Sequence, residues 1–162
     1  YILFIPAIIY GAFNLFPGVL SDNQRDKVLT KYANGYGLFK WANKEFDKLN
    51  YNGHVITMHR SISLLKTDPI SMDFVFFTDI EKKEYKKYLD EILELNPKYI
   101  LSTSSNNNKW KKLFFKCNLK LITQKEKVGF HSTRKPFSRG SFYTGEIYSI
   151  NLSKKPNCIK KY

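Results

Sequence analysis

The hydrophobic pattern divides the chain into an apolar N-terminal segment and a longer part in which helical and strand-like patterns alternate. Residues 1–20 contain no charged side chain and only one strongly polar one, Asn14. About 20 apolar residues are what a helix needs to cross roughly 30 Å of hydrocarbon. Pro17 and Gly18 then end the helical pattern. We therefore expect a transmembrane helix over residues 1–20, with burial in a soluble core as the alternative.

Two periodicities alternate beyond this segment. Apolar residues at helical spacing predict helices over residues 38–49, 80–95 and 107–117. Short apolar runs predict buried strands over residues 54–58, 74–77, 99–102, 119–123 and 147–152, with a loop over residues 124–144. Strands separated by helices imply crossover connections. The sequence thus predicts a small three-layer α/β domain with a mainly parallel, Rossmann-like sheet, to which the final strand adds at an antiparallel edge.

These patterns suggest three parts for the 162 residues. Residues 1–20 would be the last transmembrane helix, residues 21–155 the α/β domain, and residues 156–162 a basic C-terminal tail. The chain starts with Tyr1, in the middle of the hydrophobic pattern, rather than with Met. We interpret it as a fragment of a longer membrane protein, whose upstream transmembrane region is an expected partner.

Positive charge is concentrated in the last third of the chain. Residues 1–108 hold 13 Lys and Arg against 12 Asp and Glu, whereas residues 109–162 hold 14 Lys and Arg against only Glu126 and Glu146. The second segment therefore carries a net charge of +12. Such a surface attracts phosphate groups of lipids, sugars or nucleic acid. Since 23 of the 27 basic residues are Lys, a merely solvated face and a compositional bias remain alternatives.

Candidate anion-binding residues fall into two groups. A parallel sheet binds ligands at the carboxyl ends of its strands, where Arg60, Ser104 and Ser105 are expected. Ser hydroxyls there could contact a phosphate or simply cap the next helix. Arg134 and Arg139 lie in the loop before the last strand, and the guanidinium group makes bidentate contacts with phosphate. These five residues form the predicted anion site, with a solvated basic loop as the alternative for the two late arginines.

The sequence offers no recognisable catalytic or cofactor-binding motif. It contains neither a P-loop nor a Gly-x-Gly-x-x-Gly run that opens a helix. His54, His59 and His131 are scattered, and neither they nor Cys117 and Cys158 have metal-ligand spacing. The two cysteines could pair in an oxidising compartment, although Cys117 also fits an apolar core position. We therefore expect no catalytic residue, cofactor or metal site in this chain.

The order of parts resembles the C-terminal end of multi-pass membrane glycosyltransferases of the GT-C class. The similar pieces are the apolar run YILFIPAIIYGAFNLFPGVL, the helix GLFKWANKEFDKLN, the strand HVITMH, and NPKYILSTSS with a late Arg-Lys-Pro-Phe segment before EIYSINL. In that class, which uses polyprenyl-phosphate sugars, a last membrane span leads to an extracytoplasmic domain. The catalytic carboxylate of the class lies in an early loop that this chain does not contain, so no catalytic residue is carried over.

The resemblance implies an accessory role in sugar transfer from a lipid-phosphate donor. The chain would then lie in the bacterial inner membrane, with its α/β domain on the periplasmic side, and catalysis would belong to the upstream part. Three other hypotheses remain: a basic module that binds lipid headgroups or, less favourably, nucleic acid; an independent α/β enzyme whose N-terminal segment is core; and an uncharacterised membrane protein of the same build.

Overall fold

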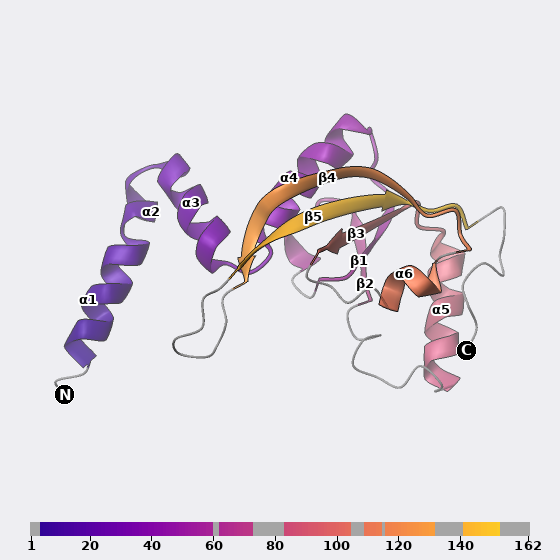
Figure 1. Cartoon of the computed structure of the whole chain (residues 1–162), viewed down its shortest axis with the longest axis horizontal. Helices are drawn as coiled ribbons and strands as arrows, with labels where there is room; N and C mark the ends of the chain where they lie inside the picture. The colour runs from indigo at the N-terminus through magenta and orange to yellow at the C-terminus, as the bar shows by residue number, and fades with distance from the viewer. Residues whose placement is uncertain are drawn as a thin grey trace.

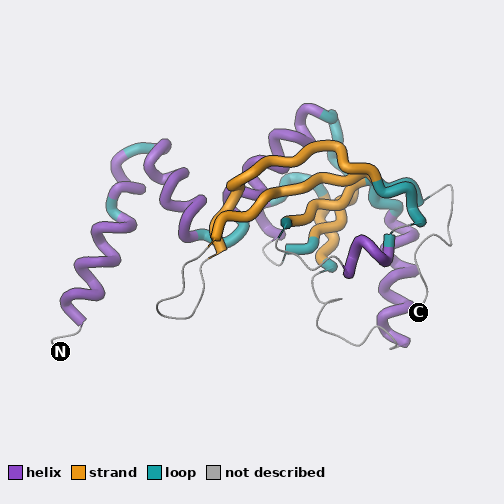
Figure 2. Tube along the Cα trace, in the orientation of Figure 1, coloured by secondary structure: helices purple, strands orange, loops and turns teal. Residues whose placement is uncertain are grey.

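A five-stranded sheet forms the centre of the computed structural model, which describes residues 4–59, 62–72, 83–104, 109–114, 116–131 and 141–152. The strands are β1 (His54–Thr57), β2 (Asp68–Ser71), β3 (Tyr99–Thr103), β4 (Lys120–His131) and β5 (Ser141–Ser149). The helices are α1 (Phe4–Leu15), α2 (Pro17–Leu20), α3 (Asp22–Tyr32), α4 (Tyr36–Lys48), the 3-10 turn η1 (Ile62–Leu64), α5 (Lys83–Leu95) and α6 (Lys109–Leu113). Figures 1 and 2 show their arrangement.

The sheet is mixed, with the strand order β2-β1-β3-β5-β4. β1 pairs in parallel with β2 and β3, as a sheet with crossover connections requires. β5 instead pairs antiparallel with both β3 and β4, and these two ladders contain most of the residue pairs. The α/β class is thus confirmed, but the sheet is not mainly parallel, because parallel pairing is limited to β2, β1 and β3. The prediction of a loop over residues 124–144 was wrong, because β4 and β5 occupy most of these residues and pair with each other.

Two hydrophobic clusters lie on opposite faces of the sheet, so the domain has three layers. Successive residues of a strand point to opposite faces. Accordingly Leu101 packs with α4 on one face, while its neighbour Ile100 packs with Ile92 of α5 and Trp110 of α6 on the other. Figure 1 shows α4 on one side of the sheet and α5 and α6 on the opposite side. We call these faces the α4 face and the α6 face.

The structure agrees with several predicted elements and also contains α3 and β2, which the sequence pattern did not reveal. α4, β1, α5 and β3 lie within a few residues of their predicted bounds, but α6 is only five residues long. α3 was not predicted, and no strand was predicted over the residues of β2, which include Pro69. Because β2 is an edge strand, a proline is tolerated in it. The strand predicted at 74–77 lies outside the described residues.

The N-terminal arm, comprising α1, α2 and α3, projects from the domain, and α1 lies farthest from the sheet (Figure 1). α1 has 12 residues, and the helical course is interrupted at Phe16 before Pro17 begins α2. In the part of the chain that the structure describes, no helix combines the length and apolarity needed to cross a membrane. The single transmembrane helix expected over residues 1–20 is therefore corrected to two shorter apolar helices.

Apolar side chains of the arm are exposed rather than buried against the sheet. Ile8 is 62% exposed and Phe13 78% exposed, so the alternative of a core helix does not apply to them. Other large exposed side chains of this segment are Ile5, Ile9, Tyr10, Phe16, Val19 and Leu20. Asn14, the polar residue of the segment, accepts a hydrogen bond from Tyr32 Oη at 2.7 Å and thereby joins α1 to α3.

A polar contact around Asp26 connects the arm to the domain. Asp26 of α3 accepts hydrogen bonds from Tyr36 Oη at 2.6 Å and from the Lys40 ammonium, both on α4. Lys40 first and Tyr36 second hold the pKa of the Asp26 carboxyl below its ordinary value. Between the two helices, Gly35 has a positive φ of 83°, which a glycine adopts without strain. The bonds of Asp26 thus hold α3 against α4 across the tight turn at Gly35.

Acidification should loosen this connection. Because the pKa of Asp26 is lower in the folded state, its stabilising effect is present above about pH 4 and is lost as the pH falls through the lowered value. We expect the amide resonances of α3 and of the α4 N-terminus to shift together on titration from pH 6 to pH 2. The variant Asp26→Asn should remove this common transition, and its persistence in that variant would assign it to another group.

Candidate functional site

The structure places one of the five predicted anion-site residues. Ser104 follows β3 directly; its N–H donates to the Thr144 carbonyl at 2.9 Å, and its Oγ accepts from the Thr144 N–H at 3.0 Å. The Ser104 side chain therefore continues the β3–β5 ladder by one step. Arg60, Ser105, Arg134 and Arg139 lie outside the described residues, so the structure does not bring the predicted set together.

A different polar cluster lies beside Ser104, on the α6 face of the sheet. β5 places Glu146 opposite Ser102 of β3, and α6 places Lys111 over the same region. Lys111 Nζ lies 3.4 Å from Glu146 Oε2, and Tyr148 Oη donates a hydrogen bond to the same oxygen at 2.9 Å. We call Trp110, Lys111, Glu146 and Tyr148 the Lys111 cluster.

Aromatic rings and partial burial fix the charges of the Lys111 cluster. Lys111 Nζ lies 5.0 Å from the centre of the Tyr148 ring and 5.6 Å from that of Trp110, at cation–π distance. The two rings meet edge to face at 5.2 Å. The Glu146 side chain is 15% exposed and that of Lys111 34% exposed. The ammonium is thus enclosed from one side and open to solvent on the other.

The protonation states make this cluster an electrostatic clamp rather than a proton-transfer site. Burial lowers the pKa of Lys111, but the Tyr148 hydroxyl and the Glu146 carboxylate outweigh it, and the net pKa is raised. Burial is also the main reason why the pKa of Tyr148 is raised. At neutral pH the lysine is therefore charged and the tyrosine neutral. A charged lysine cannot attack a carbonyl, whereas it can hold α6 on the sheet and attract an anion.

Another group of polar residues lies on the α4 face around His59. His59 follows β1, as Ser104 follows β3, so both lie at the carboxyl ends of the parallel strands. Its Nε2 lies 3.3 Å from Asn34 Oδ1, and its ring meets the Phe39 ring edge to face at 5.3 Å. A Cβ atom at Gly35 would lie 2.6 Å from His59 Cε1. These contacts make His59 a packing partner of the turn before α4. Among the described residues, no three His, Cys, Asp or Glu side chains are placed to hold a metal ion.

Sequence reasoning missed Lys111, Glu146 and Tyr148, although one signal was present. Alternation along a strand puts Glu146 on the same face as Tyr148 and Ile150, which belong to the α6-face core. A carboxylate on a buried face requires a partner. The sequence therefore indicated that Glu146 would need a positively charged partner. It did not show that this partner would be Lys111 of α6.

The variant Glu146→Gln tests the clamp. Without the carboxylate we expect the pKa of Lys111 to fall, because Coulombic attraction and the hydrogen bond to Glu146 both raise it. Stability should fall by about 1 kcal/mol, since the pair is partly solvent-screened. NMR titration of the lysine side chains and thermal unfolding measure the two effects. Lys112→Met is the matched control, because Lys112 is exposed on the same helix. An unchanged Lys111 titration would contradict the clamp.

Comparison with known proteins gives one positive result. Residues 30–161 match the family described as DUF1420 C-terminal domain, and this stretch begins near the end of α3 and includes α4 and the whole sheet. No curated protein and no solved structure matches the sequence significantly. The family match covers far more than half of the 162 residues. The chain therefore belongs to the family of DUF1420 C-terminal domains.

Proposed function

We propose that this chain is a membrane-anchored accessory domain, held at the lipid surface by the apolar side chains of its N-terminal arm. The observation that carries the proposal is the exposure of large apolar residues along α1 and α2, in a 20-residue segment without a charge. Contiguous exposed apolar surface of this kind marks contact with lipid or with another protein. Lipid is the favoured contact because the segment is apolar on all sides instead of along one stripe.

The dimensions of the arm limit how it enters the membrane. A 12-residue helix is about 18 Å long, against roughly 30 Å for the hydrocarbon layer. We therefore propose that α1 inserts into the lipid, with α2 near the boundary and the polar α3 outside. The bonds of Asp26 to Tyr36 and Lys40 would then hold the α/β domain close to the membrane surface.

The cysteine chemistry supports an extracytoplasmic location. Cys117 is fully buried on the α6 face and is disulfide-bonded. The sequence has one other cysteine, Cys158, which lies outside the described residues. Disulfides persist in oxidising compartments such as the periplasm and are rare in the cytosol. An oxidised Cys117 thus favours a domain on the outer side of a membrane.

The Lys111 cluster and the resemblance to GT-C glycosyltransferases support the proposal of an accessory role. The cluster holds a protonated lysine and a paired carboxylate, which suits binding better than proton transfer. The resemblance supplies the specific hypothesis that an upstream membrane part transfers sugar from a polyprenyl phosphate. In the full-length protein, deletion of residues 30–161 should then lower sugar transfer without abolishing donor binding by the membrane part.

A second candidate function is binding of an anionic surface by the basic half of the chain. Several exposed lysines of α6, β4 and the turn between them form no ion pair with a described residue; they are Lys112, Lys116, Lys120, Lys125 and Lys127. Near an anionic leaflet, each basic residue contributes on the order of 1 kcal/mol. This function complements membrane anchoring and differs from it in its dependence on salt.

Flotation with neutral phosphatidylcholine vesicles tests the anchoring proposal without a contribution from lipid charge. The chain should float with the vesicles, and the double variant Ile8→Glu/Phe13→Glu should bind more than about a hundredfold less. Each of these side chains contributes roughly 1.5–3 kcal/mol when it leaves water, and together they account for that factor. Thermal unfolding should change little, because both residues are exposed.

The matched control is Leu64→Glu/Leu95→Glu, which replaces two exposed leucines of the α/β domain by the same charge. This variant should float as the parent does. Equal loss of binding in both double variants, or failure of the parent chain to float, would contradict lipid anchoring by the arm.

A further inference from the structure

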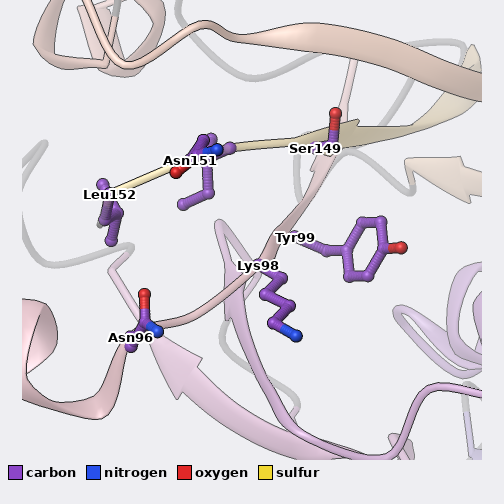
Figure 3. Close-up of a pocket in the computed structure, with 7 residues that line it drawn as sticks. Asn96, Lys98, Tyr99, Ser149, Asn151 and Leu152 are labelled. Atoms are coloured by element: carbon purple, nitrogen blue, oxygen red, sulfur yellow. The ribbon is translucent and has the colours of Figure 1, made fainter. Parts of the chain in front are cut away.

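A shallow pocket of about 260 Å³ lies at the amino end of β3, the opposite edge of the sheet from Ser104. Two segments form it: residues 96–99, which connect α5 to β3, and residues 149–152, which end β5. The Ile150 N–H donates to the Lys98 carbonyl at 2.9 Å and holds the segments together. Figure 3 shows Asn96 and Lys98 on one segment, with Asn151 and Leu152 on the other.

The side chains around this pocket are rich in hydrogen-bond donors. They comprise one ammonium group, two carboxamides and two hydroxyls, from Lys98, Asn96, Asn151, Tyr99 and Ser149, and none of the described lining residues is a carboxylate. The remaining lining residues, Ile150 and Leu152, are buried and apolar. Ser149 Oγ donates to the Lys120 carbonyl and the Tyr99 ring packs against Phe46 and Tyr51, so the Lys98 ammonium and the Asn96 carboxamide are the donors on which the proposal rests. Such a lining favours an anionic ligand that has several acceptor oxygens.

Lys98 is available to a ligand. It is exposed, and it forms no ion pair with a described residue, whereas Lys87 of α5 pairs with Glu91. The presence of an asparagine at position 96 can also be explained by the backbone. Its φ of 46° lies in the left-handed region that asparagine tolerates at the end of a helix. A test must therefore separate the carboxamide of Asn96 from its backbone conformation.

We propose that this pocket binds a phosphate group, either free or as the headgroup of a larger molecule. Its volume lies below the roughly 300–1,000 Å³ of pockets for drug-sized ligands, which fits a single oxyanion better than a whole nucleotide. Charge-assisted bonds from an ammonium group to phosphate oxygens are among the stronger hydrogen bonds in proteins. Ser104, the described residue of the predicted anion site, does not line this pocket, and the proposal does not depend on the apolar arm.

Titration of the chain with inorganic phosphate, followed by backbone NMR, tests the proposal. We expect saturable shifts at residues 96–99 and 149–152. Lys98→Met should raise the Kd about tenfold, and Asn96→Gly, which keeps the left-handed backbone accessible, should raise it a few-fold. Lys27→Met is the control of equal charge change, since Lys27 is an exposed lysine of α3 that does not line the pocket, and it should leave the Kd nearly unchanged. Absence of saturable shifts at the pocket, or an equal effect of Lys27→Met, would overturn the proposal.

The source of the phosphate is distinguished with vesicles in the Ile8→Glu/Phe13→Glu background, in which anchoring by the arm is removed. If the site takes a lipid headgroup, this variant should bind vesicles that contain phosphatidic acid, and Lys98→Met should reduce that binding about tenfold. If the site takes free phosphate, the NMR shifts remain while Lys98→Met leaves vesicle binding unchanged. Failure of the anchoring proposal would appear only in the flotation with neutral lipid, so the two results are independent.

Discussion

Gly37→Ala is expected to lower the free energy of unfolding by about 3 kcal/mol and the unfolding midpoint by about 10 °C. A Cβ atom at Gly37 would lie 1.9 Å from the Val128 carbonyl oxygen and 2.9 Å from Thr30 Cγ2. The first contact is with backbone, so it is relieved only by moving α4 away from β4. In a closely packed interior that displacement disturbs the whole α4-face core.

Gly11→Ala is the matched control for this substitution. Apart from its chain neighbours and the adjacent helix backbone, no described atom lies within 4 Å of the position that a Cβ would take at Gly11, which is in the middle of α1. Alanine there should favour the helix by about 1 kcal/mol. Thermal and chemical unfolding of the two variants measure the contrast. Parent-like stability of Gly37→Ala would show that α4 and β4 are less closely apposed than the structure has them.

Reduction of the Cys117 disulfide should lower the stability by about 2–5 kcal/mol. Cys117 is fully buried on the α6 face among Phe114, Tyr148 and Ile150, and it ends the segment that carries α6. Part of the loss comes from the larger freedom of the unfolded chain once the cross-link is gone. The chain would then be markedly more stable in an oxidising compartment than in the cytosol.

Thermal unfolding with and without a reducing agent measures this effect. Cys117→Ala, which avoids placing a hydroxyl in the core, should resemble the reduced parent and should no longer respond to the reductant. If the reductant leaves the midpoint of the parent unchanged, the disulfide does not contribute to stability, and its support for an extracytoplasmic location is lost.

The sequence predicted those elements whose burial is visible in a local pattern. α4 has apolar residues at helical spacing, and β1 and β3 are short apolar runs buried on both faces. Such signals depend only on residues within one element. The helix α3 gave no such signal because none of its residues is buried, and it is held by Asp26 and Tyr32 instead of by an apolar face.

The β4–β5 hairpin was hidden for a different reason. Much of β4 is an exposed edge strand of alternating Lys, Gln and Glu, with two register irregularities, between Leu121 and Thr123 and between Lys125 and Gly129. Charged residues and bulges protect an edge strand from aggregation, and they also erase the apolar alternation by which strands are recognised. Its pairing with β5 is a tertiary contact that no short window contains.

The Lys111 cluster could not be predicted for the same reason. Lys111 and Glu146 lie far apart in the sequence, and they meet because β5 is inserted beside β3, where Glu146 faces Ser102. The expectation of a mainly parallel sheet placed the last strand at an edge, away from that position. Of the predicted anion site, only Ser104 lies in the described part, and its polar groups serve the β3–β5 ladder.

The position of β5 has a consequence for how the chain is made. β5 lies between β3 and β4, although it is the last of the described strands in sequence order, and it supplies residues to both hydrophobic clusters. During synthesis β4 emerges first and has no strand to pair with until residues 141–149 follow. Contacts of long sequence separation also form slowly. The pairing of β3 with β5 and of β5 with β4 therefore forms only after residues 141–149 have been synthesised, so the sheet closes late in synthesis.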